Sequence, residues 1–106
     1  MENWIDVAPV DAFEREIVHT LDYEGTSIAV IRMDSEFYAV ANVCTHDYEL
    51  MEEDDLEGEE LVCPRHGARF CIRTGAALSP PAVEDLDTFP IKVEANLVMV
   101  CVDSLI

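Results

Sequence analysis

Short segments rich in β-branched and aromatic residues, repeatedly interrupted by turn-forming residues, most constrain how this chain can fold. Such segments are typical of strands in small antiparallel sheets. The segments that predict strands are 15–21, 27–33, 36–42, 61–63, 68–72, 88–94 and 97–103. Turn formers at 22–25 and 34–35 connect the first three into two hairpins, and Ala95 and Asn96 form the last tight turn. We therefore expect an all-β fold.

Other stretches of the sequence interrupt this pattern. Pro9 and Pro90 suit strand ends or edges, because proline has no N–H to donate to a neighbouring strand. Only 10–16 has the pattern of a short helical turn. Residues 47–60 hold nine acidic side chains in fourteen positions, which is typical of a solvated loop. A glycine and paired prolines indicate a stiff surface loop, rather than a strand, over 74–82.

Size and charge limit the class of protein. The 106 residues are expected to form a single domain, 1–106, with one modest core, and an apolar content of 50% argues against disorder. No apolar run approaches the roughly 20 residues of a membrane-spanning helix. Residues 1–4 lack the basic region of a signal peptide, so we expect a cytoplasmic protein. A net charge of −17 disfavours binding to nucleic acid or to anionic membranes.

Two short segments each combine a cysteine with a histidine. Cys44 precedes His46 by two positions, and Cys63 precedes His66 by three. Structural zinc sites usually take two cysteines from one loop and two histidines from a helix. Here each segment mixes the two residue types, which suits a binuclear centre in which both thiolates bind one iron and both imidazoles bind the other. Zinc remains the alternative at this point.

The pattern C-x-H-x16-C-x2-H, formed by these four residues, resembles the motif of Rieske proteins. Over essentially the whole chain, the sequence looks most like the ferredoxin components of bacterial aromatic-ring-hydroxylating dioxygenase systems. The matching positions outside the motif are Gly67, Phe70, Thr74, Gly75, 79–81 and 88–90. The resemblance implies a Rieske-type fold of stacked small antiparallel sheets, with a cluster-binding subdomain formed by two loops at about 43–82. It also implies one [2Fe–2S] cluster, bound by Cys44, His46, Cys63 and His66, with 79–81 packed over it.

The same resemblance implies a function. The protein would be a monomeric one-electron carrier, not an enzyme, between an NAD(P)H-dependent flavoprotein ferredoxin reductase and the terminal oxygenase of such a system. An oxygenase acting alone is excluded, because it needs a further iron site with two histidines and a carboxylate, and only His19 is left over. The alternatives are a Rieske-like small subunit or a zinc-stabilised interaction domain of another redox complex.

Departures from related proteins refine this interpretation. Rieske proteins of respiratory complexes carry a disulfide between the two ligand loops, but Glu49 and Arg65 occupy the matching positions here. Those proteins also place a serine and a tyrosine hydroxyl near the cluster, where this chain has Ala68 and Phe70. Fewer hydrogen bonds to the cluster predict a low reduction potential. Asp47 stands where the dioxygenase ferredoxins usually have glycine.

The remaining candidates have ordinary structural interpretations. Cys71 and Cys101 are expected to be small, partly buried side chains, with a disulfide between them as the alternative. His19 is expected to be a surface or hydrogen-bonded residue. Three of the six basic residues, Arg65, Arg69 and Arg73, either pair locally with acidic residues or give a cationic spot for a partner. The acidic run 47–60 is either a solvated loop or a docking surface that steers the protein to basic patches.

Overall fold

Eleven strands and one short helix account for the regular structure in the part of the chain that the computed structural model describes, residues 3–14, 17–42, 56–62, 68–79 and 85–103. The elements are β1 (Trp4–Pro9), the 3₁₀ helix η1 (Val10–Phe13), β2 (Val18–Tyr23), β3 (Thr26–Met33), β4 (Glu36–Ala41), β5 (Leu56–Glu57), β6 (Glu60–Val62), β7 (Arg69–Cys71), β8 (Ala77–Ser79), β9 (Thr88–Phe89), β10 (Ile91–Glu94) and β11 (Leu97–Cys101). The predicted all-β class is confirmed.

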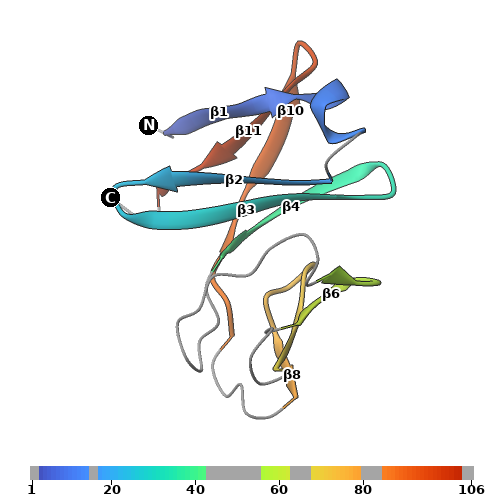
Figure 1. Cartoon of the computed structure of the whole chain (residues 1–106). Helices are drawn as coiled ribbons and strands as arrows, with labels where there is room; N and C mark the ends of the chain where they lie inside the picture. The colour runs from blue at the N-terminus through green and yellow to red at the C-terminus, as the bar shows by residue number, and fades with distance from the viewer. Residues whose placement is uncertain (1–2, 15–16, 43–55, 63–67, 80–84, 104–106) are drawn as a thin grey trace.

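The strands form three antiparallel sheets, with orders β1-β11-β10, β2-β3-β4-β9 and β5-β6-β7-β8. The first two sheets lie together in the upper part of Figure 1, and the third forms a separate lower part. This arrangement is the expected stack of small antiparallel sheets. The predicted cluster-binding part, about 43–82, includes the whole third sheet.

Strand β3 is buried on both of its faces, because successive side chains of a strand point to opposite sides. Ile28 and Val30 pack in one hydrophobic cluster with residues of β11, including Val98 and Val100. Ala29 and Ile31 pack in a second cluster with residues of the third sheet, including Leu61 and Phe70. The expected single core is therefore two clusters, and the second sheet is the wall between them.

The tight turns follow the residues that allow a left-handed backbone. The β2–β3 turn has positive φ at Glu24 and Gly25, and the β10–β11 turn has positive φ at Ala95 and Asn96. Two consecutive residues of this kind are typical of two-residue hairpins. The predicted hairpins and the last turn at 95–96 are confirmed. The expected helical turn in 10–16 is confirmed as the shorter η1.

The predicted single strand 88–94 is two strands, β9 and β10, separated by Pro90. Phe89 pairs with Ala39 of β4, whereas Ile91 pairs with Val100 of β11, so the chain changes sheet at the proline. Proline has no N–H with which to continue a ladder, which explains the break. Pro90 still accepts a hydrogen bond at its carbonyl from the backbone N–H of Cys101, at 3.0 Å.

Three strands and part of a fourth lie where the sequence indicates loops or gives no signal. β8 lies inside the predicted loop 74–82, and β5 and part of β6 lie inside the acidic run 47–60, of which 47–55 lies outside the described residues. β1 pairs with β11 at the other end of the chain. Each depends on a partner strand rather than on its own sequence, and only tertiary context identifies such strands. No helix in the described ranges is both long and apolar enough to cross a membrane.

The two-sided burial of β3 predicts a large cost for Ile28→Ala. The Ile28 side chain is 0% exposed, so the change leaves a cavity and should lower the free energy of unfolding by about 2–5 kcal/mol. Urea denaturation measures this difference. Val93→Ala is the matched control, because Val93 is 45% exposed and its truncation should change stability by less than about 0.5 kcal/mol. Equal effects of the two changes would contradict the proposed packing.

Candidate metal centre

The four predicted ligands, Cys44, His46, Cys63 and His66, lie outside the described residues, together with Arg65 and most of the acidic run. The structure does describe the strands from which their segments begin and to which the second returns. The first segment follows Asn42 at the end of β4. The second segment runs from Val62 at the end of β6 to Ala68, just before β7.

Strands β6 and β7 hold the two ends of the second cysteine–histidine segment together. Val62 is paired with Arg69, and Leu61 with Phe70, in an antiparallel ladder. Opposite residues of such a ladder have Cα atoms about 4.5–5.5 Å apart, so Val62 and Arg69 hold the two ends of this segment close together. Leu61, Ala68 and Phe70 are at most 1% exposed. The buried ladder gives the second ligand segment a rigid base.

Asn42 marks the point where the chain leaves β4 toward the first ligand segment. Its backbone N–H donates to the carbonyl of Ser27 at 2.9 Å, and its Nδ2 donates to the Ser27 Oγ at 3.5 Å. The side chain is 3% exposed, and its Oδ1 accepts no hydrogen bond within the described ranges. Buried acceptors are normally paired. An unpaired amide oxygen two residues before Cys44 fits a polar site, rather than more apolar core, beyond the end of β4.

The donor set also fits a mixed thiolate–imidazole centre. Of the four cysteines and three histidines in the sequence, the structure describes Cys71, Cys101 and His19. Both cysteines are free thiols, so the alternative of a disulfide between them is wrong. No group of three His, Cys, Asp or Glu that could hold a metal occurs within the described segments. The remaining cysteines and histidines are the four predicted ligands.

His19 and Cys71 have local hydrogen-bond partners. His19 Nε2 lies 3.0 Å from the carbonyl oxygen of Ala12, and the ring packs at 4.3 Å from that of Phe13. The expectation of a hydrogen-bonded histidine is confirmed. A hydrogen bond with the Thr74 hydroxyl lowers the pKa of the partly exposed Cys71 thiol. Cys101 is buried, as expected for a small side chain.

The two described arginines of the predicted cationic spot are each bound to two carboxylates. Arg69 contacts Glu57 and Glu60, both at 3.2 Å. Arg73 contacts Glu59 and also Glu36, the latter at 3.4 Å. The interpretation of local pairing is confirmed for both residues. Arg69 and Arg73 therefore give no net positive charge to this side of the third sheet.

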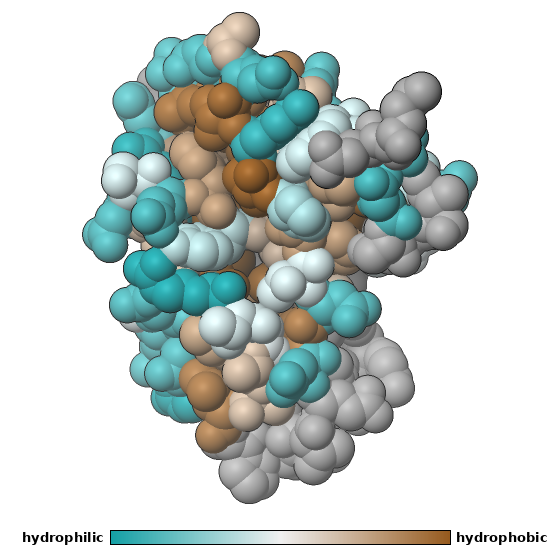
Figure 2. Space-filling view, turned by 180° about the vertical axis from the view of Figure 1, so that it is seen from behind, coloured by the Kyte–Doolittle hydropathy of each residue, from teal (hydrophilic) through white to brown (hydrophobic). Residues whose placement is uncertain are grey.

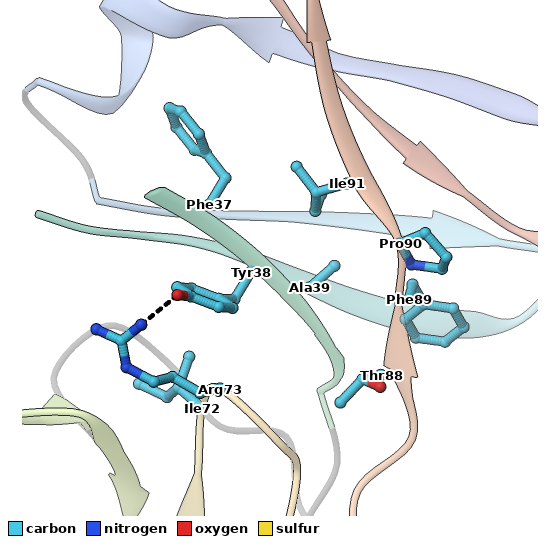
Figure 3. A pocket seen from close by; sticks show the side chains of 9 residues that line it. All are labelled: Phe37, Tyr38, Ala39, Ile72, Arg73, Thr88, Phe89, Pro90 and Ile91. Atoms are coloured by element: carbon cyan, nitrogen blue, oxygen red, sulfur yellow. Dashed lines mark hydrogen bonds between the residues drawn. The ribbon is translucent and has the colours of Figure 1, made fainter. Parts of the chain in front are cut away.

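Arg73 also joins the third sheet to the second. Its Nη1 donates to the Tyr38 hydroxyl of β4 (Figure 3). That hydroxyl in turn donates to the Glu36 carboxylate. The hydrogen bond from Tyr38 lowers the pKa of Glu36, with a further contribution from the Arg73 charge. The same bond raises the pKa of Tyr38, because losing its proton would leave two negative groups side by side.

A pocket of about 400 Å³ lies next to this pair, between β4 and the segment around Pro90 (Figure 3). Its polar side chains are those of Arg73, Tyr38 and Thr88, and the first two are hydrogen-bonded to each other. Phe37, Phe89 and Ile91 give much of its apolar wall. Because the lining offers no paired acid and base or activated nucleophile, we assign it no catalytic role.

Comparison with known proteins agrees with this framework. Residues 3–90 match the family described as the Rieske [2Fe-2S] domain. The chain is 40% identical over 98 residues to the ferredoxin component of naphthalene 1,2-dioxygenase/salicylate 5-hydroxylase systems from Ralstonia sp., covering 92% of this chain and 94% of the relative. It is 38% identical over 102 residues to the ferredoxin component of a 2,4-dinitrotoluene dioxygenase system from Burkholderia sp., covering 96% and 98%.

Solved structures show the same fold. A chain in the complex of reduced oxygenase and oxidized ferredoxin in carbazole 1,9a-dioxygenase superposes with a TM-score of 0.85 at 29% identity, covering 92% of both chains. The Sphingomonas yanoikuyae B1 ferredoxin superposes with a TM-score of 0.82 at 28% identity, covering 93% of this chain and 98% of that one. In sequence and in fold, the chain belongs to the Rieske [2Fe–2S] family and is similar throughout to its dioxygenase-system ferredoxins.

Proposed function

We propose that this protein carries single electrons from a flavoprotein ferredoxin reductase to the terminal oxygenase of an aromatic-ring-hydroxylating dioxygenase system. The observation that carries the proposal is the match to relatives named as ferredoxin components, which spans nearly all of this chain and nearly all of each relative. Those relatives are named as ferredoxin components of dioxygenase systems and not as their oxygenases. His19, the one histidine of this sequence outside the predicted ligand set, has its Nε2 3.0 Å from the carbonyl oxygen of Ala12.

The residues proposed to hold the single [2Fe–2S] cluster are Cys44 and Cys63 on one iron and His46 and His66 on the other. When bound, such a cluster takes up and releases one electron, at a higher potential than all-cysteine clusters have. The protein contributes the rigid strand ends on which both ligand segments begin. Ala68 and Phe70 are both 0% exposed and carry no hydroxyl group. They support a potential at the low end of the Rieske range, since hydrogen bonds to the cluster stabilise its reduced state.

The partners are inferred from the named systems and from charge. One similar structure is a complex of ferredoxin with a terminal oxygenase. The net charge of −17 favours positively charged docking surfaces on both partners and disfavours nucleic acid and membranes. The carrier is proposed to act as a monomer in the cytoplasm, which gel filtration and cell fractionation test.

Ligand and control variants test the proposed cluster site. The wild-type protein should contain two irons and two sulfides per chain, absorb visible light, and give a Rieske-type EPR signal after reduction with dithionite. Cys63→Ser and His66→Ala should each abolish that signal. Cys71→Ser and His19→Ala are the matched controls and should keep the signal. Cys71 is hydrogen-bonded to Thr74, and His19 to the carbonyl of Ala12. A colourless protein with one zinc per chain would refute the proposal.

Salt dependence tests electrostatic docking. The screening length falls from about 30 Å at 0.01 M salt to about 8 Å at 0.15 M, so electrostatic steering should weaken strongly over this range. We expect the second-order rate constant for oxygenase reduction, measured by stopped flow, to fall at least about tenfold. A rate that does not fall would exclude steering by the acidic surface.

A matched pair of double variants locates the steering charge. Glu52→Gln with Glu53→Gln removes two charges from the acidic run, while Asp22→Asn with Glu24→Gln removes two from the β2–β3 turn region. The first double variant should slow oxygenase reduction at low salt several times more than the second. Equal slowing would show that only the total charge matters, and that 47–60 is no special docking surface.

A further inference from the structure

Gly75 lies in a buried junction between the third sheet and the segment that leads into β9. Its N–H donates to the carbonyl of Cys71 at 2.7 Å, at the end of β7. Its own carbonyl accepts from the N–H of Leu86, also at 2.7 Å. Among the described residues, this is the backbone hydrogen bond that ties the third sheet to 85–89. The Ala77 N–H, which donates to Asp85 Oδ1 at 2.8 Å, is the second tie across the same junction.

The segment 85–89 is bound in turn to β4. The Ala41 N–H donates to the Asp87 carbonyl at 2.8 Å, and Thr88 is paired with Val40 in the ladder. Leu86 is 4% exposed and lies in the same hydrophobic cluster as Val40 and Phe70. A continuous hydrogen-bonded path therefore runs from β7, which follows Cys63 and His66, to β4, which precedes Cys44 and His46.

Only glycine fits at this junction. Its φ is +77°, and a Cβ atom at this position would lie 2.2 Å from the Leu86 carbonyl oxygen and 3.1 Å from Thr88 Cγ2. Ordinary contact begins at 3.4 Å, so an alanine would push the Leu86 carbonyl away by about 1.2 Å. The obstacle is backbone, which a side-chain rotation cannot relieve. Any displacement must pass into 85–89 or into the end of β7.

We propose that Gly75 is a positioning residue that sets the spacing between the two cysteine–histidine segments. The proposal rests on the ligand set given under the proposed function. Four ligands from two segments must be held within about 0.5 Å of their working geometry. A shift of 1.2 Å at the junction exceeds that tolerance. Gly75 therefore governs how firmly the cluster is held and how its reduced state is tuned.

Gly75→Ala and Gly58→Ala form a matched pair for the test. Gly58 lies in the β5–β6 turn of the same sheet and also has a positive φ, +60°, but a Cβ atom there meets nothing within 4 Å. Both variants carry the backbone strain of alanine at positive φ. Only Gly75→Ala adds the collision with Leu86. The difference between the two variants therefore isolates the junction from general loss of stability.

The measurements are the EPR g values, the reduction potential, and the rate of iron loss to a chelator, all on purified protein reconstituted with iron and sulfide. Gly75→Ala should shift or broaden the EPR signal, move the reduction potential and lose iron at least about tenfold faster than the wild type. Gly58→Ala should melt at a lower temperature but keep the wild-type spectrum and potential. Identical spectra, potentials and iron-loss rates in the two variants would overturn the proposal.

Asp85→Ala covers the case in which Gly75→Ala does not fold. This change removes the second tie across the junction without adding an atom, and Asp85 is exposed. It should accelerate iron loss in the same direction by a smaller factor, whereas no change in spectrum or iron loss would count against a positioning role. This comparison requires only that the wild-type protein takes up the cluster; it does not require a redox partner. Failure of the wild type to reduce an oxygenase would refute the proposed function while leaving this test intact.

Discussion

The double-sided burial of β3 is the constraint on which the rest of this structure depends. Ile28 and Val30 face one hydrophobic cluster, while Ala29 and Ile31 face the other. Because both faces of the strand are covered, the third sheet is fixed to the second sheet by apolar packing as well as by hydrogen bonds. The strand ends that lead into the ligand segments are therefore held by one of the two clusters, the one that contains Val40, Leu61 and Ala68. On the proposed function, such a frame holds the strand ends that lead to the cluster in place before a partner binds.

Among the residues that the structure describes, charge around this frame is arranged in ion pairs rather than in a cationic patch. Arg69 and Arg73 each contact two carboxylates, so both sites keep a net negative charge while crosslinking the third sheet. Arg73 also reaches Tyr38 of the second sheet, which makes it a polar contact between the two parts of the molecule (Figure 3). The pairing explains how so acidic a chain keeps a compact third sheet. It also leaves the acidic excess available for docking.

The hairpins can be predicted from the sequence, because the strands and the turn of a hairpin are adjacent in the chain. β2, β3 and β4 are rich in β-branched and aromatic residues and are joined by turns with positive φ at Gly25 and Asp34, so the pattern and the turns agree. β1 and β8 were not predicted, because each exists only through a partner strand. The sequence favours a strand end or edge for Pro90. That the chain passes from one sheet to another there depends on where β4 and β11 lie. The ligand motif came from residue types and spacing alone. The junction at Gly75 did not, since a glycine reveals its close contact only in three dimensions.

A carrier with one cluster and two partners must leave each of them quickly. Long-range charge raises the rate of encounter without adding the tight apolar contact that slows dissociation. On the described surface, the exposed large hydrophobic residues are Ile17, Leu78 and Val93. On the face shown in Figure 2, hydrophilic residues surround separate hydrophobic areas. On the proposed function, the net charge of −17 is then a kinetic property: it brings the carrier to its partners and leaves little apolar contact to hold it there.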